Sequence, residues 1–235
     1  MNVDIMEPLA RESTREYAYR VLKANIMKLK LLPGTALSEK DISVLLNVSR
    51  TPVREAFIRL SQEYLLDVVP QKGTYVSLID LDNVKESKFL RQIVEKEVIK
   101  LACTEFSNDK LVELQSCLSL QEACVRNNQP LDFFELDEIL HSTIFAGCHK
   151  TRVWTITQQM HTHYNRVRIM NVSGGHDMPR ILAQHRELVR AIQTQDVQLG
   201  SETIYLHINK VTFDLKELMN QYPNYFKQIS LTESL

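Results

Sequence analysis

The segment SRTPVREA places two arginines, Arg50 and Arg54, four residues apart, with Thr51 between them. Residues four apart on an α-helix lie on one face, so the two guanidinium groups would project together. An arginine can donate two parallel hydrogen bonds to O6 and N7 of guanine, and the hydroxyl groups of Ser49 and Thr51 can bind phosphate. The alternative is an ordinary solvated helix face. The spacing indicates a surface that could read DNA if other elements hold this segment as a helix.

A second set of residues has the chemistry of metal ligands. Asp137 and His141 are four residues apart, so a helix would place them on one face. His185 and His207 each lie in the middle of a separate segment of helical periodicity. A carboxylate and imidazoles from several helices can enclose a divalent cation, and one carboxylate with three imidazoles suits Zn, Ni, Mn or Fe. The alternative is three separate core histidines, because distant positions in the sequence do not by themselves bring side chains together.

The elements that would position the arginines lie before residue 79. Apolar spacing predicts three helices, over residues 15–31, over 38–46 and from 49 onward. Two apolar or β-branched runs follow, Leu66–Val69 and Thr74–Leu78, on either side of a turn, which is a hairpin signal. Three helices and a hairpin in this order predict a winged helix-turn-helix, whose third helix enters the major groove of DNA. Lys72 and Gly73 at the hairpin tip could approach the DNA backbone or the minor groove.

The elements that would position the metal ligands lie after Asp80, where the pattern is helical almost to the end of the chain. Breaks in the periodicity predict helices near residues 81–105, 108–127, 131–146, 151–172, 178–194 and 196–220. We therefore expect a mostly α protein with a winged helix-turn-helix domain over residues 1–79. An all-helical bundle is expected over residues 80–235.

Composition excludes several classes of protein. The 235 residues carry a formal net charge of -1, with 44% hydrophobic and 24% charged residues, as in ordinary folded domains and unlike disordered chains. Without an uninterrupted apolar run of about 18 residues, or an apolar leader at the start, we expect a cytoplasmic protein with no membrane partner. The 4 cysteines form no C-x-x-C motif and are expected to be reduced and mostly buried.

Residues 26–78 resemble the DNA-binding domain of GntR-type bacterial regulators, and SRTPVREA carries most of the resemblance. The resemblance implies that Arg50, Thr51 and Arg54 contact DNA. It also implies that Lys40 touches the DNA backbone and that Gly73 lies at the tip of the wing.

Two residues depart from the usual pattern of that family. Asn47 stands where glycine is usual, and Asn tolerates a left-handed backbone. Tyr64 follows Glu63 where Glu-Gly is usual, and we expect it to alter the turn between the third helix and the wing.

Residues 81–215 resemble the FCD ligand-binding domain of the FadR subfamily, through Asp137-x-x-x-His141, the segment HRELVRAI that begins at His185, Asp196 and His207. Members that bind metal use an aspartate and three histidines at these places, so the resemblance implies metal ligands at Asp137, His141, His185 and His207.

Arg91 and Glu95 match an Arg-x-x-x-Glu in the first helix of the FCD domain. In the family that arginine faces the pocket and can pair with a ligand carboxylate. The alternative for Arg91 is a surface ion pair with Glu95. The roles of four further residues stay open, although one of the two arginines could hold an anion: His161, His163, Arg166 and Arg168.

The leading hypothesis is a dimeric DNA-binding regulator, with repression as the expected sign. It would bind a palindromic operator, and a small carboxylate beside a divalent metal would control its affinity. The alternatives are a metal-dependent enzyme acting on a small organic acid and a regulator whose metal is only a structural clamp. An acyl-CoA sensor is disfavoured, because those relatives lack the metal histidines.

Overall fold

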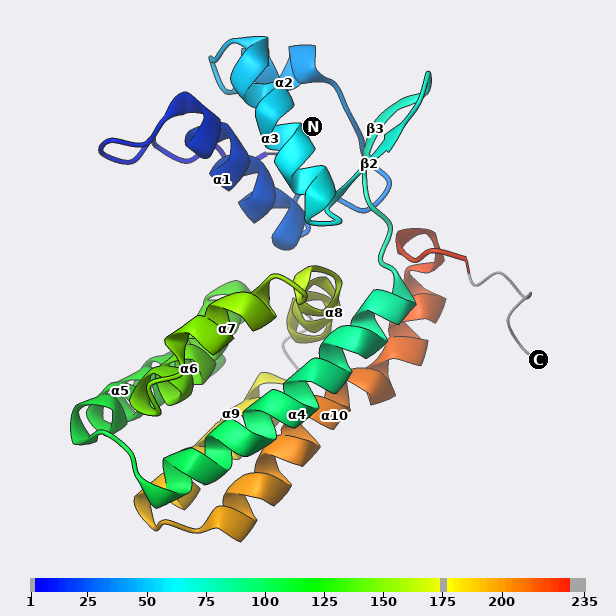
Figure 1. Cartoon of the computed structure of the whole chain (residues 1–235). Helices are drawn as coiled ribbons and strands as arrows, with labels where there is room; N and C mark the ends of the chain where they lie inside the picture. Colours follow the sequence, from blue (N-terminus) through cyan, green and yellow to red (C-terminus); the bar gives the residue numbers. More distant parts are fainter. Residues whose placement is uncertain (1–2, 174–176, 229–235) are drawn as a thin grey trace. The chain divides into compact units, whose positions relative to one another are not determined.

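The computed structural model describes residues 3–173 and 177–228, with residues 210–214 described by their backbone alone. The chain divides into two compact units (Figure 1). The N-terminal unit comprises the chain up to Leu81 together with the segment from Met219 onward, and the C-terminal unit is Asp82–Leu218.

The N-terminal unit contains the predicted three helices and hairpin. Its elements are α1 (Thr14–Met27), β1 (Ala36–Leu37), α2 (Glu39–Leu45), α3 (Arg50–Gln62), β2 (Leu66–Val69) and β3 (Gly73–Val76). The strands form an antiparallel sheet in the order β1-β3-β2, with Leu37 opposite Thr74 and Leu66 opposite Val76. The two-residue strand β1 was not predicted, because its pairing with β3 is a tertiary contact without a local pattern.

The orientation of α3 is fixed by its apolar face. Val53, Ala56, Phe57 and Leu60 are buried in one core with residues of α1 and α2, as their i, i+3, i+4, i+7 spacing requires. The opposite face of α3 is consequently left to solvent.

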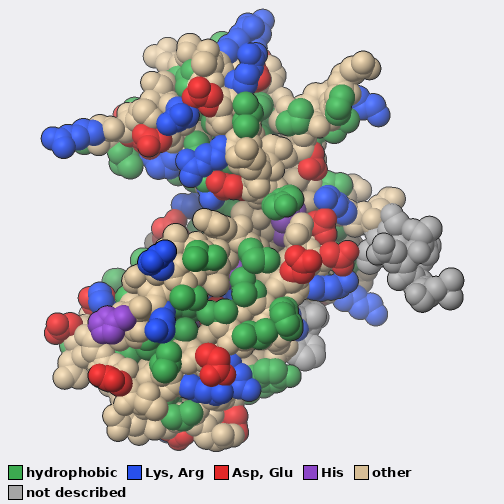
Figure 2. Space-filling view, viewed as in Figure 1, with side chains coloured by type: hydrophobic (Ala, Val, Ile, Leu, Met, Phe, Trp, Pro, Cys, Tyr) green, Lys and Arg blue, Asp and Glu red, His purple; other side chains and the backbone are tan. Residues whose placement is uncertain are grey.

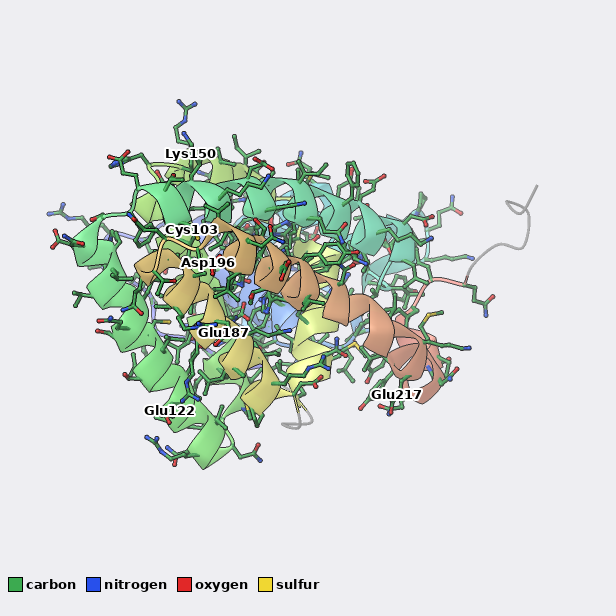
Figure 3. All side chains as sticks on the ribbon, turned by 90° about the horizontal axis from the view of Figure 1, so that it is seen from below. Cys103, Glu122, Lys150, Glu187, Asp196 and Glu217 are labelled. Atoms are coloured by element: carbon green, nitrogen blue, oxygen red, sulfur yellow. The ribbon has the colours of Figure 1, made fainter. Side chains whose placement is uncertain are left out.

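The C-terminal unit is entirely helical among its described residues. Its helices are α4 (Leu81–Thr104), α5 (Asn108–Asn127), α6 (Pro130–Gly147), α7 (Thr151–Gln158), α8 (Thr162–Ser173), α9 (Met178–Gln193) and α10 (Val197–Gln221). α4 and α10 lie side by side (Figures 1 and 3), joined by a hydrogen bond of 2.9 Å from Gln92 Nε2 to Asn209 Oδ1. A shared apolar core includes Ile99, Leu114, Leu140, Leu188 and Ile208, which come from five different helices.

The prediction of one helix over residues 151–172 is wrong, because the chain breaks between α7 and α8. Met160 and His161 donate backbone hydrogen bonds three residues back, to Thr157 and Gln158, which ends α7. The Met160 carbonyl accepts a hydrogen bond from Ser87 Oγ of α4. The break therefore depends on a contact with a distant helix, and no glycine or proline marks it in the sequence.

The end of the described chain returns to the segment that leaves β3. Ile79 and Phe226 form a parallel β-bridge, in which Ile79 N donates to Tyr225 O at 2.7 Å and Lys227 N donates to Ile79 O at 2.9 Å. Both apolar side chains are buried, and Lys227 Nζ lies 3.0 Å from Asp80 Oδ2. This segment belongs to the N-terminal unit although it follows the last helix.

Two further predictions can be compared with the structure. All four cysteines are free, three of them buried and Cys148 half-buried, as predicted. Among the described residues, no helix combines the length and apolar character needed to cross a bilayer.

Candidate nucleic-acid interface and metal centre

The N-terminal unit exposes all seven residues that the sequence assigned to a DNA surface. They are Lys40, Ser49, Arg50, Thr51, Arg54, Lys72 and Gly73. Figure 2 shows Lys and Arg side chains gathered where α2 and α3 lie and beside the β2–β3 hairpin. Ser49 is the N-cap of α3, and its side chain makes no capping hydrogen bond. The start of α3 thus presents backbone N–H groups and hydroxyl groups beside two arginines, which is a surface suited to phosphate and base edges.

Arg54 is held by a residue that the sequence did not single out. Its Nε lies 3.0 Å from Glu39 Oε1, and its Nη2 lies 2.9 Å from Glu39 Oε2. Glu39 is the first residue of α2, so the contact joins the two helices of the helix-turn-helix. Only the helix-turn-helix geometry could have revealed the pair, because the two residues are fifteen positions apart.

Gly73, Asn47 and Tyr64 are among the residues of this unit that have a left-handed backbone. Gly73 at the wing has φ +131°, a conformation that L side chains rarely adopt. Asn47 and Tyr64, the two departures from the usual pattern, have φ +52° and +59°. The family's glycines at these places would meet the same backbone requirement without steric cost, whereas Tyr64 meets it with a strained backbone.

In the C-terminal unit the structure brings Asp137, His141, His185 and His207 together. One ligand atom from each lies within 4.8 Å of the others, and all four side chains are buried. His141 Nε2 is 3.1 Å from His207 Nε2, and His185 Nε2 is 3.4 Å from Asp137 Oδ1. Helices α6, α9 and α10 supply these residues, so the cluster exists only in the folded bundle.

The opposite ring nitrogen of each histidine faces an oxygen acceptor. Glu95 Oε2 lies 2.9 Å from His141 Nδ1, Gln121 Oε1 lies 2.9 Å from His185 Nδ1, and Gln184 Oε1 lies 3.2 Å from His207 Nδ1. Acceptors at Nδ1 favour the tautomer that leaves the Nε2 lone pair free, as second-shell partners do in metal sites. Sequence reasoning did not identify Gln121 and Gln184, because amide side chains carry no distinctive signal.

The cluster fits a cation better than it fits a closed hydrogen-bond network. His185 Nε2 is buried and has no hydrogen-bond partner, and buried polar atoms of this kind are normally satisfied. Burial lowers the pKa of His185 and, with the two neighbouring histidines, holds the pKa of His207 well below its usual value. Burial would raise the pKa of Asp137, but Arg168 and the neighbouring histidines lower it well below its usual range. Neutral imidazoles and an ionised carboxylate are the states that bind a divalent metal.

A cavity adjoins this cluster. Asp137 and His207 line it, together with Arg91, Tyr164 and Arg168, and the remaining lining is largely apolar. The Arg91 Nε donates to Glu95 within the bundle, while its Nη2 is buried without a hydrogen-bond partner. Arg91 is 2% exposed, so the surface ion pair considered from the sequence is not what the structure contains.

His161, His163, Arg166 and Arg168, whose roles the sequence left open, are all buried. The two arginines differ in their relation to the cavity. Arg168 lines the cavity and donates hydrogen bonds to Asp137 and Glu138. Arg166 instead contacts His163, with 2.8 Å between Nη2 and Nδ1. His161 is buried beside Arg91, and burial lowers its pKa to about 3.

Asp196, which was part of the resemblance, serves the start of a helix and is not part of the metal cluster. It lies at the turn before α10 (Figure 3), and its Oδ1 accepts a hydrogen bond of 2.9 Å from Leu199 N. A carboxylate in this position caps the helix that carries His207.

Comparison with known proteins gives a consistent result for both units. The gntR family of bacterial regulatory proteins matches residues 14–76, and the FCD domain matches residues 88–210. The HTH-type transcriptional repressor RspR of Escherichia coli K12 is 29% identical over 217 residues, which cover 92% of this chain and 95% of RspR. An uncharacterized HTH-type transcriptional regulator, YdfH of Escherichia coli O6:H1, is 30% identical over 210 residues, 89% of this chain and 92% of YdfH. The solved structure of E. coli McbR/YncC has a similar fold, with a TM-score of 0.75 at 19% identity over 90% of this chain and 99% of that one.

Proposed function

Because the chain belongs to the GntR family of bacterial regulatory proteins and carries an FCD domain, we propose that it represses transcription under the control of a small carboxylate bound beside a metal ion. The family and the named relatives are transcriptional regulators, which removes the support for a metal-dependent enzyme. Repression is supported by RspR and by the gluconate operon repressors of Bacillus, which are 21% and 22% identical to this chain.

The proposed DNA surface is the exposed start of α3 with the wing. Arg50 and Arg54 would read base edges, while Ser49, Thr51 and the N-terminus of α3 would hold phosphate. Lys40 would contact the backbone, and Lys72 and Gly73 would approach the groove from the wing. All seven residues are exposed, and those of α3 lie outside its buried apolar stripe, which supports this assignment.

The proposed metal ligands are Asp137, His141, His185 and His207. When bound, Zn, Ni, Mn or Fe would act as a Lewis acid that attracts a carboxylate oxygen. Glu95, Gln121 and Gln184 would keep the three rings in the orientation that presents Nε2 to the ion. This resembles the metal-binding members of the FadR subfamily.

One observation carries the effector proposal: Arg91 is buried and lines the cavity beside the metal cluster, and its Nη2 has no hydrogen-bond partner. A small carboxylate could satisfy the arginine with one oxygen and the metal with the other. A metabolite without an acceptor oxygen would leave Nη2 of Arg91 without a hydrogen bond, which is costly in a buried site. We therefore propose an organic acid small enough to be enclosed beside Arg91, Tyr164 and Arg168.

Control of DNA binding would follow from linkage. The carboxylate would bind one arrangement of the FCD domain better than another, and the preferred arrangement would change operator affinity. A homodimer is required if the operator is palindromic, because each half-site needs its own recognition helix. Three exposed apolar side chains of α4, Phe89, Ile93 and Leu101, support contact with a second copy.

The test combines metal analysis with DNA binding. The purified protein, the chelated protein and His185→Ala are assayed for metal content and for retardation of the DNA upstream of the gene. Hydroxy acids and sugar acids are then titrated into each protein–DNA complex. We expect stoichiometric metal in the wild type only, and a carboxylate that releases DNA only from the metal-loaded protein. Release that is equally strong after chelation would contradict the proposal.

A further inference from the structure

The contact between Glu39 and Arg54 has a geometry that matters for base reading. Nε of Arg54 lies 3.0 and 3.2 Å from the two oxygens of Glu39, and Nη2 lies 2.9 Å from Oε2. A guanidinium is planar and has two edges that can each donate two parallel hydrogen bonds. The carboxylate occupies the Nε–Nη2 edge, so the Nη1–Nη2 edge is left for another acceptor pair.

The surroundings of the pair argue against a role in folding. The Arg54 side chain is 65% exposed and that of Glu39 is 31% exposed. Ion pairs with this exposure contribute little to stability, because both groups are nearly as well solvated apart. A carboxylate on a surface that approaches phosphate also weakens electrostatic attraction. Its placement therefore needs another explanation.

We propose that Glu39 is a positioning residue, which fixes the side chain of Arg54 so that its free edge can bind O6 and N7 of one guanine in each half-site. This inference rests on the proposed DNA contact of Arg54. A long arginine side chain loses rotamer freedom when it binds a base, and a partner that holds it beforehand removes part of that cost. Glu39 thereby weakens the sequence-independent attraction to phosphate and increases the discrimination between bases.

The charges around Glu39 are consistent with this role. The hydrogen bond from Arg54 lowers the pKa of Glu39, and the nearby charge of Arg50 lowers it further. The carboxylate is therefore ionised at neutral pH and able to accept both hydrogen bonds.

The experiment starts from a duplex selected with the wild-type protein from a random library. Dissociation constants are measured at one salt concentration for this duplex and for a scrambled duplex, because salt alone changes both. Their ratio is the specificity. We expect Arg54→Ala to lower it about 10- to 100-fold. Glu39→Gln should lower it about 3- to 10-fold, the effect of ordering one flexible side chain, without weakening binding to the scrambled duplex.

Two comparisons separate positioning from a general charge effect. In the Arg54→Ala background, Glu39→Gln should cause no further loss of specificity. Glu55→Gln is the control, because it removes a carboxylate from the same unit, whose Oε2 lies 3.9 Å from Arg15 Nε. It should change binding to both duplexes equally. Replacing single guanines by 7-deazaguanine removes the N7 acceptor. At one position this replacement should weaken DNA binding by the wild type far more than DNA binding by the Glu39→Gln variant.

The outcomes distinguish this inference from the proposed function. If Arg54→Ala keeps the wild-type specificity, the assigned DNA contact is wrong and the inference falls with it. If Arg54→Ala loses specificity while Glu39→Gln retains it and stays sensitive to 7-deazaguanine, only the positioning role is overturned.

Discussion

The Arg54–Glu39 pair of the N-terminal unit and the Arg91–Glu95 pair of the C-terminal unit join the same functional groups in opposite surroundings. The first pair is largely exposed, with side chains 65% and 31% accessible, while the second is 2% and 4% accessible. In water the attraction is weak, and the pair restricts a side chain without stabilising the fold. In the bundle both charges have lost their hydration, so each depends on the other. The exposed pair therefore orients an arginine side chain in the N-terminal unit. The buried pair forms a preorganised site in the C-terminal unit, at a cost in desolvation.

The largest expected difference between the two pairs is in stability. Glu95→Ala would leave the Arg91 guanidinium buried without its partner and should destabilise the C-terminal unit by about 3–5 kcal/mol. Glu39→Ala should cost less than about 1 kcal/mol in the N-terminal unit. Urea unfolding followed by the fluorescence of Trp154, the only tryptophan and a residue of α7, reports on the C-terminal unit. Hydrogen exchange of α1 and α3 reports on the other unit. Equal costs at the two sites would remove the basis of the comparison.

Metal removal should also affect one unit only. A ligand present at 100 times its dissociation constant stabilises the folded state by about 2.7 kcal/mol, so chelation should lower the unfolding midpoint of the C-terminal unit by a corresponding amount. His207→Ala should lose both the bound metal and the effect of chelation. His149→Ala is the matched control, because His149 is exposed and lies outside the cluster. A chelation effect that persists in His207→Ala would contradict the assigned ligands.

Acid, like metal removal, should lower the stability of the C-terminal unit more than that of the N-terminal unit. All seven histidines lie between residues 141 and 207, within the C-terminal unit. His161 has its pKa lowered to about 3 by burial, from an unfolded value of 6.5. Below pH 6.5 the unfolded chain therefore binds a proton that the folded unit does not, so stability is complete above pH 6.5 and falls as the pH decreases.

At pH 5 this difference amounts to about 2 kcal/mol. Unfolding midpoints of chelated protein at pH 7 and pH 5, read from Trp154, provide the measurement. His161→Gln should show a smaller acid response, and an unchanged response would assign the loss to other groups.

The smallest effect is expected at the turn into the wing. Tyr64 is exposed and has a left-handed backbone, so Tyr64→Gly should remove strain while losing little packing. We expect the N-terminal unit to gain about 0.5–1 kcal/mol, measured by thermal unfolding and hydrogen exchange. His149→Gly tests the same backbone conformation in the C-terminal unit, where φ is +56°. A loss of stability in Tyr64→Gly would show that the aromatic ring makes a stabilising contribution.

The sequence predicted the fold class and nearly all helices, because apolar periodicity and breaking residues are local signals. It did not predict β1 or the break before α8, since both depend on partners far away in the chain, β3 and Ser87. For the metal cluster, residue types suggested ligands, but only the resemblance joined His185 and His207 to Asp137. The supporting residues Glu39, Gln121 and Gln184 stayed undetected because their roles exist only in the folded arrangement. The choice between Arg166 and Arg168 likewise needed the cavity.

The bridge between Ile79 and Phe226 bears on how such regulators can be recombined. A hybrid that joined residues 1–80 to the effector domain of a relative would contain Ile79 without Phe226 and Asp80 without Lys227. Transferring the segment from Met219 onward together with the first part of the N-terminal unit would keep these partners together. In this protein the N-terminal unit is thus built from two segments that lie far apart in the sequence.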